Sequence, residues 1–161
     1  MWAAVDELDF VLGRAQRAAF RWEAQGIYGV RKPSLGCRRG GPGSDPDWLE
    51  ASRETAPTGV PVRRTWALAD PPTSYQQRQL GAVSSYLSAG EEVRVIGERD
   101  ALQLGLPDHD FWVLDDVLVA RLNYRDHVLQ GAELLTDAAS VNSYRKWRDL
   151  AWERSALLVV A

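Results

Sequence analysis

Alternating apolar and polar positions divide the sequence into helical and extended segments. Apolar residues recur every three or four positions between residues 5 and 17, which predicts an amphipathic helix there. Residues 20–23 alternate between apolar and charged, as a half-buried strand does, and residues 60–68 alternate in the same way. The rest of the chain adds helices predicted over 46–56, 73–88, 99–104 and 137–158, and strands predicted over 92–96, 110–114, 118–124 and 128–134.

Tight turns join the last three predicted strands. Asp115-Asp116 and Arg125-Asp126 supply residues that such turns favour, so these strands should form an antiparallel meander. Before the meander, helices and strands alternate along the chain. This order predicts an α/β (α+β) fold, in which a mixed sheet of about six strands is flanked by helices.

The length of 161 residues fits one domain, which we expect to span residues 1–161. Hydrophobic residues make up 45 % of the chain, enough for a core that needs neither a metal nor a disulfide. Residues 32–46 are rich in glycine and proline, and they predict a flexible loop.

Charge and cysteine content argue against several classes of protein. A net charge of −3 does not favour a nucleic-acid surface, which needs clustered Lys and Arg facing phosphates. Cys37 is the only cysteine, so no intramolecular disulfide can form, and a reducing compartment is indicated. No apolar run reaches the ~18 residues of a membrane span, and the acidic start is unlike a signal peptide. We therefore expect a cytoplasmic protein without direct contact to nucleic acid or membrane.

Seven tryptophans are many for a chain of this length. A core built from tryptophan is the simpler interpretation. An aromatic binding surface is the alternative.

The stretch from Asp108 to Asp116 holds several carboxylates and His109, which raises the question of a metal site. In a strand, Asp110 and Asp115 face opposite sides of the sheet. Asp110 and Asp116 face the same side but lie about 20 Å apart. One ion cannot bridge them, and the remaining Asp108, His109 and Asp110 would bind a metal only weakly. We therefore predict capped turns at both ends of a strand and no metal site.

His109 and His127 are the only histidines, and both fall in predicted turns beside carboxylates. Since adjacency in sequence is not a hydrogen bond, we interpret both as solvated turn residues. If the chain is an enzyme, Asp110 and His109 are its candidate catalytic residues. The sequence contains no P-loop, dinucleotide fingerprint, nucleophile elbow or zinc spacing, so we expect no cofactor.

Charged residues inside predicted strands form the most informative pattern. Arg21 and Glu23 lie on one strand, and Glu91 and Arg94 flank another. Buried charges are costly unless they are paired, so one interpretation is a set of ion pairs that fix the sheet. The other interpretation is a cleft in which Arg21 and Arg94 bind an anion. For Arg94 we predict a buried pair with Glu23 or Asp110.

Four motifs together resemble a known family. They are the segments Ala19–Glu23, Gly90–Arg94, Leu106–Asp116 and Tyr144–Trp152, of which the third is long and specific. These motifs span nearly the whole chain. They are similar to an actinobacterial domain family of unknown function, whose members are short stand-alone proteins often encoded beside helix-turn-helix regulators.

The resemblance marks the positions that would bind a ligand or partner. Together with Asp110, they are Arg21, Glu23, Tyr75, Glu91, Arg94, Trp112 and Asp115. Two features depart from the family pattern: residues 32–43 are glycine-rich where the family tends to be helical, and Trp22 replaces the usual leucine.

The second half of the chain also resembles, more faintly, phospholipase-D-like sensor domains. In the catalytic members of that group, a histidine, a lysine two residues later and an aspartate form the site. Here the residues two positions after His109 and His127 are Phe111 and Leu129. The resemblance therefore implies the scaffold without its hydrolase activity.

These observations predict a non-catalytic regulatory domain that binds a partner or effector and acts with a transcriptional regulator. Its partner would be a regulator protein or a small anionic ligand. The alternative is a small enzyme of specialised-metabolite biosynthesis, using a cleft lined by Arg21, Arg94 and Trp112.

Overall fold

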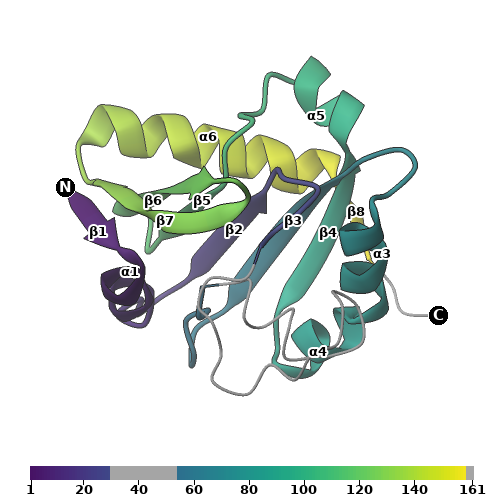
Figure 1. Ribbon diagram of the computed structural model, residues 1–161. Coiled ribbons are helices and arrows are strands. Elements are labelled where there is room, and N and C mark those ends of the chain that lie inside the picture. The colour runs from purple at the N-terminus through teal and green to yellow at the C-terminus, as the bar shows by residue number, and fades with distance from the viewer. Residues whose placement is uncertain (30–53, 159–161) are drawn as a thin grey trace.

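A single mixed sheet forms the framework of the protein (Figure 1). The structure, a computed structural model, describes residues 1–29 and 54–158. Within them eight strands are ordered β1-β7-β6-β5-β2-β3-β4-β8. The strands are β1 (Trp2–Ala4), β2 (Ala19–Glu23), β3 (Val62–Leu68), β4 (Glu92–Gly97), β5 (Phe111–Leu114), β6 (Leu118–Arg125), β7 (Val128–Leu135) and β8 (Ala156–Leu157). The helices are α1 (Val5–Leu12), α3 (Ser74–Gly81), α4 (Val83–Ser88), α5 (Glu98–Gln103) and α6 (Ala138–Arg154).

The predicted fold class is confirmed, although the sheet has eight strands rather than about six. The unpredicted strands β1 and β8 have three and two residues, too few to show an alternating pattern. Strands β2, β3 and β4 run parallel, whereas β5 pairs antiparallel with β2 and continues into the meander β5–β6–β7. The parallel and antiparallel halves therefore meet between β2 and β5.

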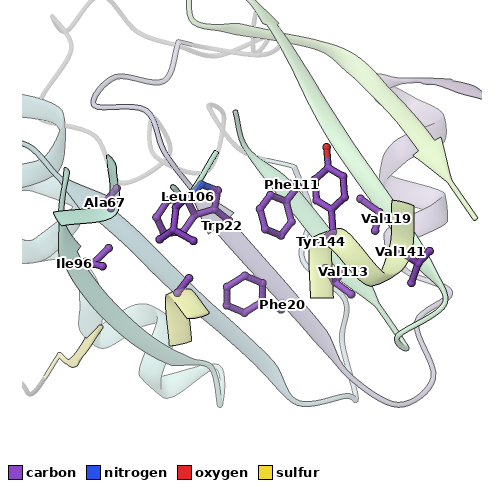
Figure 2. Packing of buried hydrophobic residues seen from close by; sticks show 12 residues of the cluster. Phe20, Trp22, Ala67, Ile96, Leu106, Phe111, Val113, Val119, Val141 and Tyr144 are labelled. Carbon is purple, nitrogen blue, oxygen red and sulfur yellow. The ribbon is translucent and has the colours of Figure 1, made fainter. Parts of the chain in front are cut away.

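Helix α6 covers one face of the sheet (Figure 1). Phe20 and Trp22 of β2 and Phe111 of β5 point to this side and pack with Tyr144 of α6, as Figure 2 shows. The ring centroids of Phe111 and Tyr144 lie 4.9 Å apart in an edge-to-face arrangement. Several tryptophans thus serve the core, as the simpler interpretation of their number predicts.

The opposite face is covered in two separate places. Leu8 and Leu12 of α1 pack against the antiparallel half, and Val83 of α4 packs against Trp66 and Val93 of the parallel half. Charged side chains occupy the sheet between these two apolar clusters.

Two tight turns shape the meander. Asp115 and Asp116 both have positive φ values, 52° and 61°, in the turn predicted for them. The second turn is centred on Asp126 and His127 rather than on Arg125-Asp126. The shift follows from β6, which extends through Arg125.

Three helices differ from their predicted bounds. α1 ends at Leu12 instead of residue 17, and the helix predicted over 73–88 divides at Ala82 into α3 and α4. The last helix ends at Arg154, because the chain then turns into β8. The predicted loop 32–46 and most of the predicted helix 46–56 lie outside the described residues. Among the helices that are described, none has the length and apolar character to cross a bilayer.

Candidate functional site

Charged side chains gather in the middle of the sheet face that α1 and α4 share. We call this group the polar centre; its members are Arg21, Glu23, Glu54, Arg64 and Asp110, each no more than 5 % exposed. The period of two along a strand places Arg21 and Glu23 of β2 on the same face. Arg21 lies in register with Arg64 of β3 on one side and Trp112 of β5 on the other. Three neighbouring strands therefore bring polar atoms to one place.

Arg21 is held by two carboxylates from outside its own strand. Its Nε donates to Glu54 Oε1 at 2.5 Å, and its Nη2 lies 2.9 Å from Asp110 Oδ2. Nη2 also donates to the hydroxyl of Tyr124 at 3.2 Å, and Nη1 donates to the carbonyl oxygen of Trp22. Every guanidinium nitrogen is therefore engaged. Burial opposes the charge of Arg21, but these carboxylates raise its pKa well above the ordinary value.

Asp110 lies just before β5, beside the carboxyl end of β2. Its Oδ1 accepts the backbone N–H of Ala24 at 2.8 Å, and its Oδ2 accepts the hydroxyl of Tyr28 at 2.6 Å. Burial raises the pKa of Asp110 above its ordinary value, against the opposing charge of Arg21. Since both oxygens have donors, this carboxyl group ties β5 to β2 and to the segment that follows β2.

Arg64 is the second cation of the polar centre. Its Nε donates to Glu91 Oε2 at 2.7 Å, and its Nη1 donates to Glu23 Oε2 at 3.4 Å. Glu23 also accepts the indole N–H of Trp66 at 2.6 Å and the side-chain amide of Gln79 at 3.1 Å. These bonds connect β2 and β3 with α3 and with the segment before β4.

The indole of Trp112 contacts both arginines. Its ring centroid lies 5.2 Å from the guanidinium carbon of Arg64 and 5.9 Å from that of Arg21. Contacts of this kind are worth about 0.5–2 kcal/mol. The indole N–H donates to Glu54 Oε1 at 2.7 Å, so Trp112 links the two cations to one carboxylate.

Glu54 is ionised in this setting. Burial alone would raise the pKa of Glu54, but Arg21 and Arg64 outweigh it and lower the pKa to about 2. Its Oε1 accepts two hydrogen bonds, whereas its Oε2 is buried and has no hydrogen-bond partner among the described residues.

Most of the sequence-predicted residues meet at this place. Glu91 and Trp112 contact the charged members directly, and Tyr75 lies beside them through a ring contact with Tyr28 at 5.4 Å. The polar centre thus contains ion pairs that connect strands, as one interpretation of the sequence proposes. The partners differ from those expected: Arg21 pairs with Glu54 and Asp110, and Glu23 pairs with Arg64.

The prediction for Arg94 is wrong. Arg94 lies on the α6 face, where its Nη1 donates to the carbonyl oxygen of Trp152 at 3.0 Å and its guanidinium carbon lies 4.3 Å from the indole centroid. Arg64 occupies the position beside Glu23 instead. Arg21 and Arg94 point to opposite faces of the sheet and do not line one cleft.

Two further predicted residues lie outside the polar centre. His109 is half-buried rather than solvated: its Nε2 lies 2.8 Å from the hydroxyl of Tyr144, and its ring contacts Trp147. Burial lowers the pKa of His109. Asp115 accepts the backbone N–H groups of residues 16–18 at 2.7–3.0 Å and so fixes the loop before β2.

Sequence reasoning missed several members of this network. The sequence pattern did point to Arg64, because this charged residue shares one face of a strand with the apolar residues Val62 and Trp66. No such pattern pointed to Glu54, Tyr28 and other partners such as Tyr124, since their contacts join segments far apart in the chain. In the ranges that the structure describes, no three His, Cys, Asp or Glu side chains lie close enough to hold a metal ion.

Comparison with known proteins identifies a family and a fold. Residues 6–158 match a domain of unknown function, DUF6879. No curated protein matches the chain in sequence. In structure the chain is similar to NucT from Helicobacter pylori, with a TM-score of 0.56, covering 95 % of this chain and 89 % of that one. At 12 % identity this likeness shows the fold alone.

Proposed function

Since the chain belongs to the DUF6879 family, whose function is unknown, we propose on physical grounds that it is a non-catalytic regulatory domain that binds a protein partner, a transcriptional regulator. Resemblance to an actinobacterial family often encoded beside helix-turn-helix regulators supports this choice of partner. The single cysteine supports a cytoplasmic location, where such a partner would be met.

The hydrogen bonding of Arg21 and Asp110, the two predicted site residues at the middle of the polar centre, carries the proposal. A catalytic acid, base or anion-binding group must present an atom to its substrate. All nitrogens of Arg21 and both oxygens of Asp110 are instead bound to other groups of the protein. This arrangement favours a role in holding the sheet together.

The enzyme alternative lacks its expected site. Its cleft required Arg21 and Arg94 on one face, and they lie on opposite faces. Whatever activity NucT has does not transfer to this chain on a similarity of 12 % identity. Neither His109 nor His127 is followed by the lysine that phospholipase-D-like catalysis uses.

A surface suited to a partner lies at the β1 edge of the sheet. A groove of about 450 Å³ is lined by Trp2, Phe10, Val11 and Leu134; we call it the α1 groove. Trp2 is 53 % exposed and Phe10 is 67 % exposed. Exposed aromatic side chains grouped beside a groove favour protein binding. α1 carries three acidic residues and no basic one, which favours a partner with a basic surface, as DNA-binding regulators have.

Size-exclusion chromatography and calorimetry with the regulator encoded beside the gene test this function. We expect a complex with a Kd of about 10 μM or tighter. Phe10→Ser should weaken it at least about tenfold, since exposed aromatic anchors dominate such interfaces. Leu102→Ser is the matched control, because Leu102 is an exposed apolar residue of α5, outside the groove. Absence of such a gene, no complex at this concentration, or equal losses in both variants contradict the proposal.

A further inference from the structure

A second hollow opens on the α6 face, where β2, β3 and β4 begin. Its volume is about 620 Å³, within the range of small-ligand pockets. Ala18 and Pro61 contribute exposed apolar lining, Phe20 and Val113 contribute lining that is almost buried, and Arg17, Arg63 and Arg148 lie around them. We call it the α6 cleft. It lies on the side of the sheet opposite the polar centre.

Most charges of the α6 cleft are committed within the protein. Arg148 donates to Asp116 and, at 2.9 Å, to Asp149. Asp115 accepts three backbone N–H groups of the loop before β2. These three carboxylates therefore already have donors, and Arg148 already has its acceptors.

Two arginines of the cleft are engaged far less. Among the residues that the structure describes, Arg17 donates to a single acceptor, the carbonyl oxygen of Asp115, at 3.1 Å. Arg63 is half-exposed; its Nε lies 3.9 Å from Glu92, and its guanidinium carbon lies 4.9 Å from the ring centroid of Trp152. Within residues 1–29 and 54–158, most N–H groups of these two guanidiniums thus have no acceptor and are available to a ligand.

We propose that the α6 cleft binds a small carboxylate with an apolar body. The planar guanidinium fork matches a carboxylate with two parallel hydrogen bonds. Arg17 and Arg63 would hold the carboxylate, while the apolar body lies against Ala18, Pro61 and the small exposed part of Phe20. This site goes beyond the proposed function, since it uses another face and another class of ligand. It also places the anion away from the arginine pair that the sequence suggested.

Glu92 provides the most specific test of the proposal. Its side chain is exposed and lies 3.9 Å from Arg63, so it competes with any anion that Arg63 binds. Removing the charge of Glu92 should therefore strengthen anion binding. A purely structural role for Arg63 and Glu92 predicts no such gain.

Benzoate is the probe, titrated into ¹⁵N-labelled full-length protein at low salt and followed by amide chemical shifts. We expect saturable shifts around Phe20, Arg63 and Val113, with a Kd near 1 mM or below. Arg63→Gln and Arg17→Gln should each weaken binding about tenfold. Glu92→Gln should strengthen it about threefold. Arg99→Gln, at an exposed position of α5, should leave it unchanged.

Neutral and inorganic probes decide the ligand class. Benzyl alcohol keeps the ring and lacks the charge, so it should bind at least about tenfold more weakly than benzoate. Inorganic phosphate should bind more weakly too, because it lacks the apolar body. The proposal is overturned if benzoate does not saturate by about 10 mM, if its shifts lie elsewhere, or if Glu92→Gln weakens binding. Equal binding of benzyl alcohol, or tighter binding of phosphate, overturns it as well.

Discussion

Replacing Arg21 with methionine removes the cation at the middle of the polar centre. The methionine keeps an unbranched side chain of similar reach, so the change is mainly one of charge and hydrogen bonding. It leaves Glu54, whose pKa is held to about 2, and Asp110 without the guanidinium that both contact. Arg21 is 2 % exposed, so water cannot take its place without local opening.

The expected loss follows from that burial. Breaking a buried ion pair by removing one partner costs about 3–5 kcal/mol, because the other charge stays buried and unpaired. The free energy of unfolding of a typical domain is about 5–15 kcal/mol. Arg21→Met should therefore remain folded but lose a large part of its stability. Arg21→Lys keeps the charge but loses the planar guanidinium and its several N–H donors, so its free energy of unfolding should fall by about 1–3 kcal/mol.

Urea denaturation followed by tryptophan fluorescence at pH 7 and pH 5 measures both effects. Without Arg21, the folded-state pKa of Asp110 rises further above its unfolded value. The folded variant then binds a proton more readily than the unfolded chain as the pH falls. The amount by which the free energy of unfolding of Arg21→Met falls below that of wild type should therefore be smaller at pH 5 than at pH 7.

Arg99→Met is the control, since Arg99 is exposed on α5 and should change stability by less than about 0.5 kcal/mol. An unfolding midpoint of Arg21→Met within error of wild type would refute the structural role of the polar centre. A deficit that grows as the pH falls would refute the electrostatic explanation.

Three further changes test other contacts. Arg94→Ala should lower the free energy of unfolding by about 1–2 kcal/mol in the same urea assay, because it removes one hydrogen bond and one cation–π contact rather than an ion pair. Tyr28→Phe should cost about 1–3 kcal/mol, since it takes one donor from the buried Asp110 carboxyl group. Gly131→Ala should speed amide hydrogen exchange in β1, because a Cβ there would lie 2.4 Å from the carbonyl oxygen of Ala3 and push β1 off β7.

Local sequence patterns predicted helices, strands and turns well where residues within the segment itself determine its structure. Alternation located β2 and β3, and paired aspartates located the turn at Asp115 and Asp116. Ala82, by contrast, divides a helix that looks continuous in sequence. Short edge strands such as β1 and β8 form because the neighbouring strands β7 and β4 offer hydrogen-bond partners. A segment of two or three residues is too short to show a pattern that predicts such pairing.

The candidate site was only partly predictable. Alternation shows which residues of one strand share a face, but it does not show which of the two faces of the sheet that is. Arg94 alternates with Val93 as Arg21 alternates with Trp22, yet the two arginines lie on opposite faces. Both faces of this sheet are covered by helices, so an apolar side chain can point either way. Glu54 and Tyr124, two of the partners of Arg21, lie 33 and 103 residues away in the chain, a separation that no local rule spans.

The same two-sided burial gives the polar centre a structural reason to exist, whatever the domain binds. When both faces are apolar, hydrophobicity specifies strand register weakly, and a slip of one residue would exchange the faces of β2. Here Glu23 accepts from Trp66 and Arg64 of the neighbouring strand, contacts that only one register allows. We therefore expect the double change Glu23→Gln with Arg64→Met to broaden amide NMR signals of β2 and β3 more than it lowers the unfolding midpoint. Sharp, dispersed signals at a reduced midpoint would show that the charges supply stability and not register.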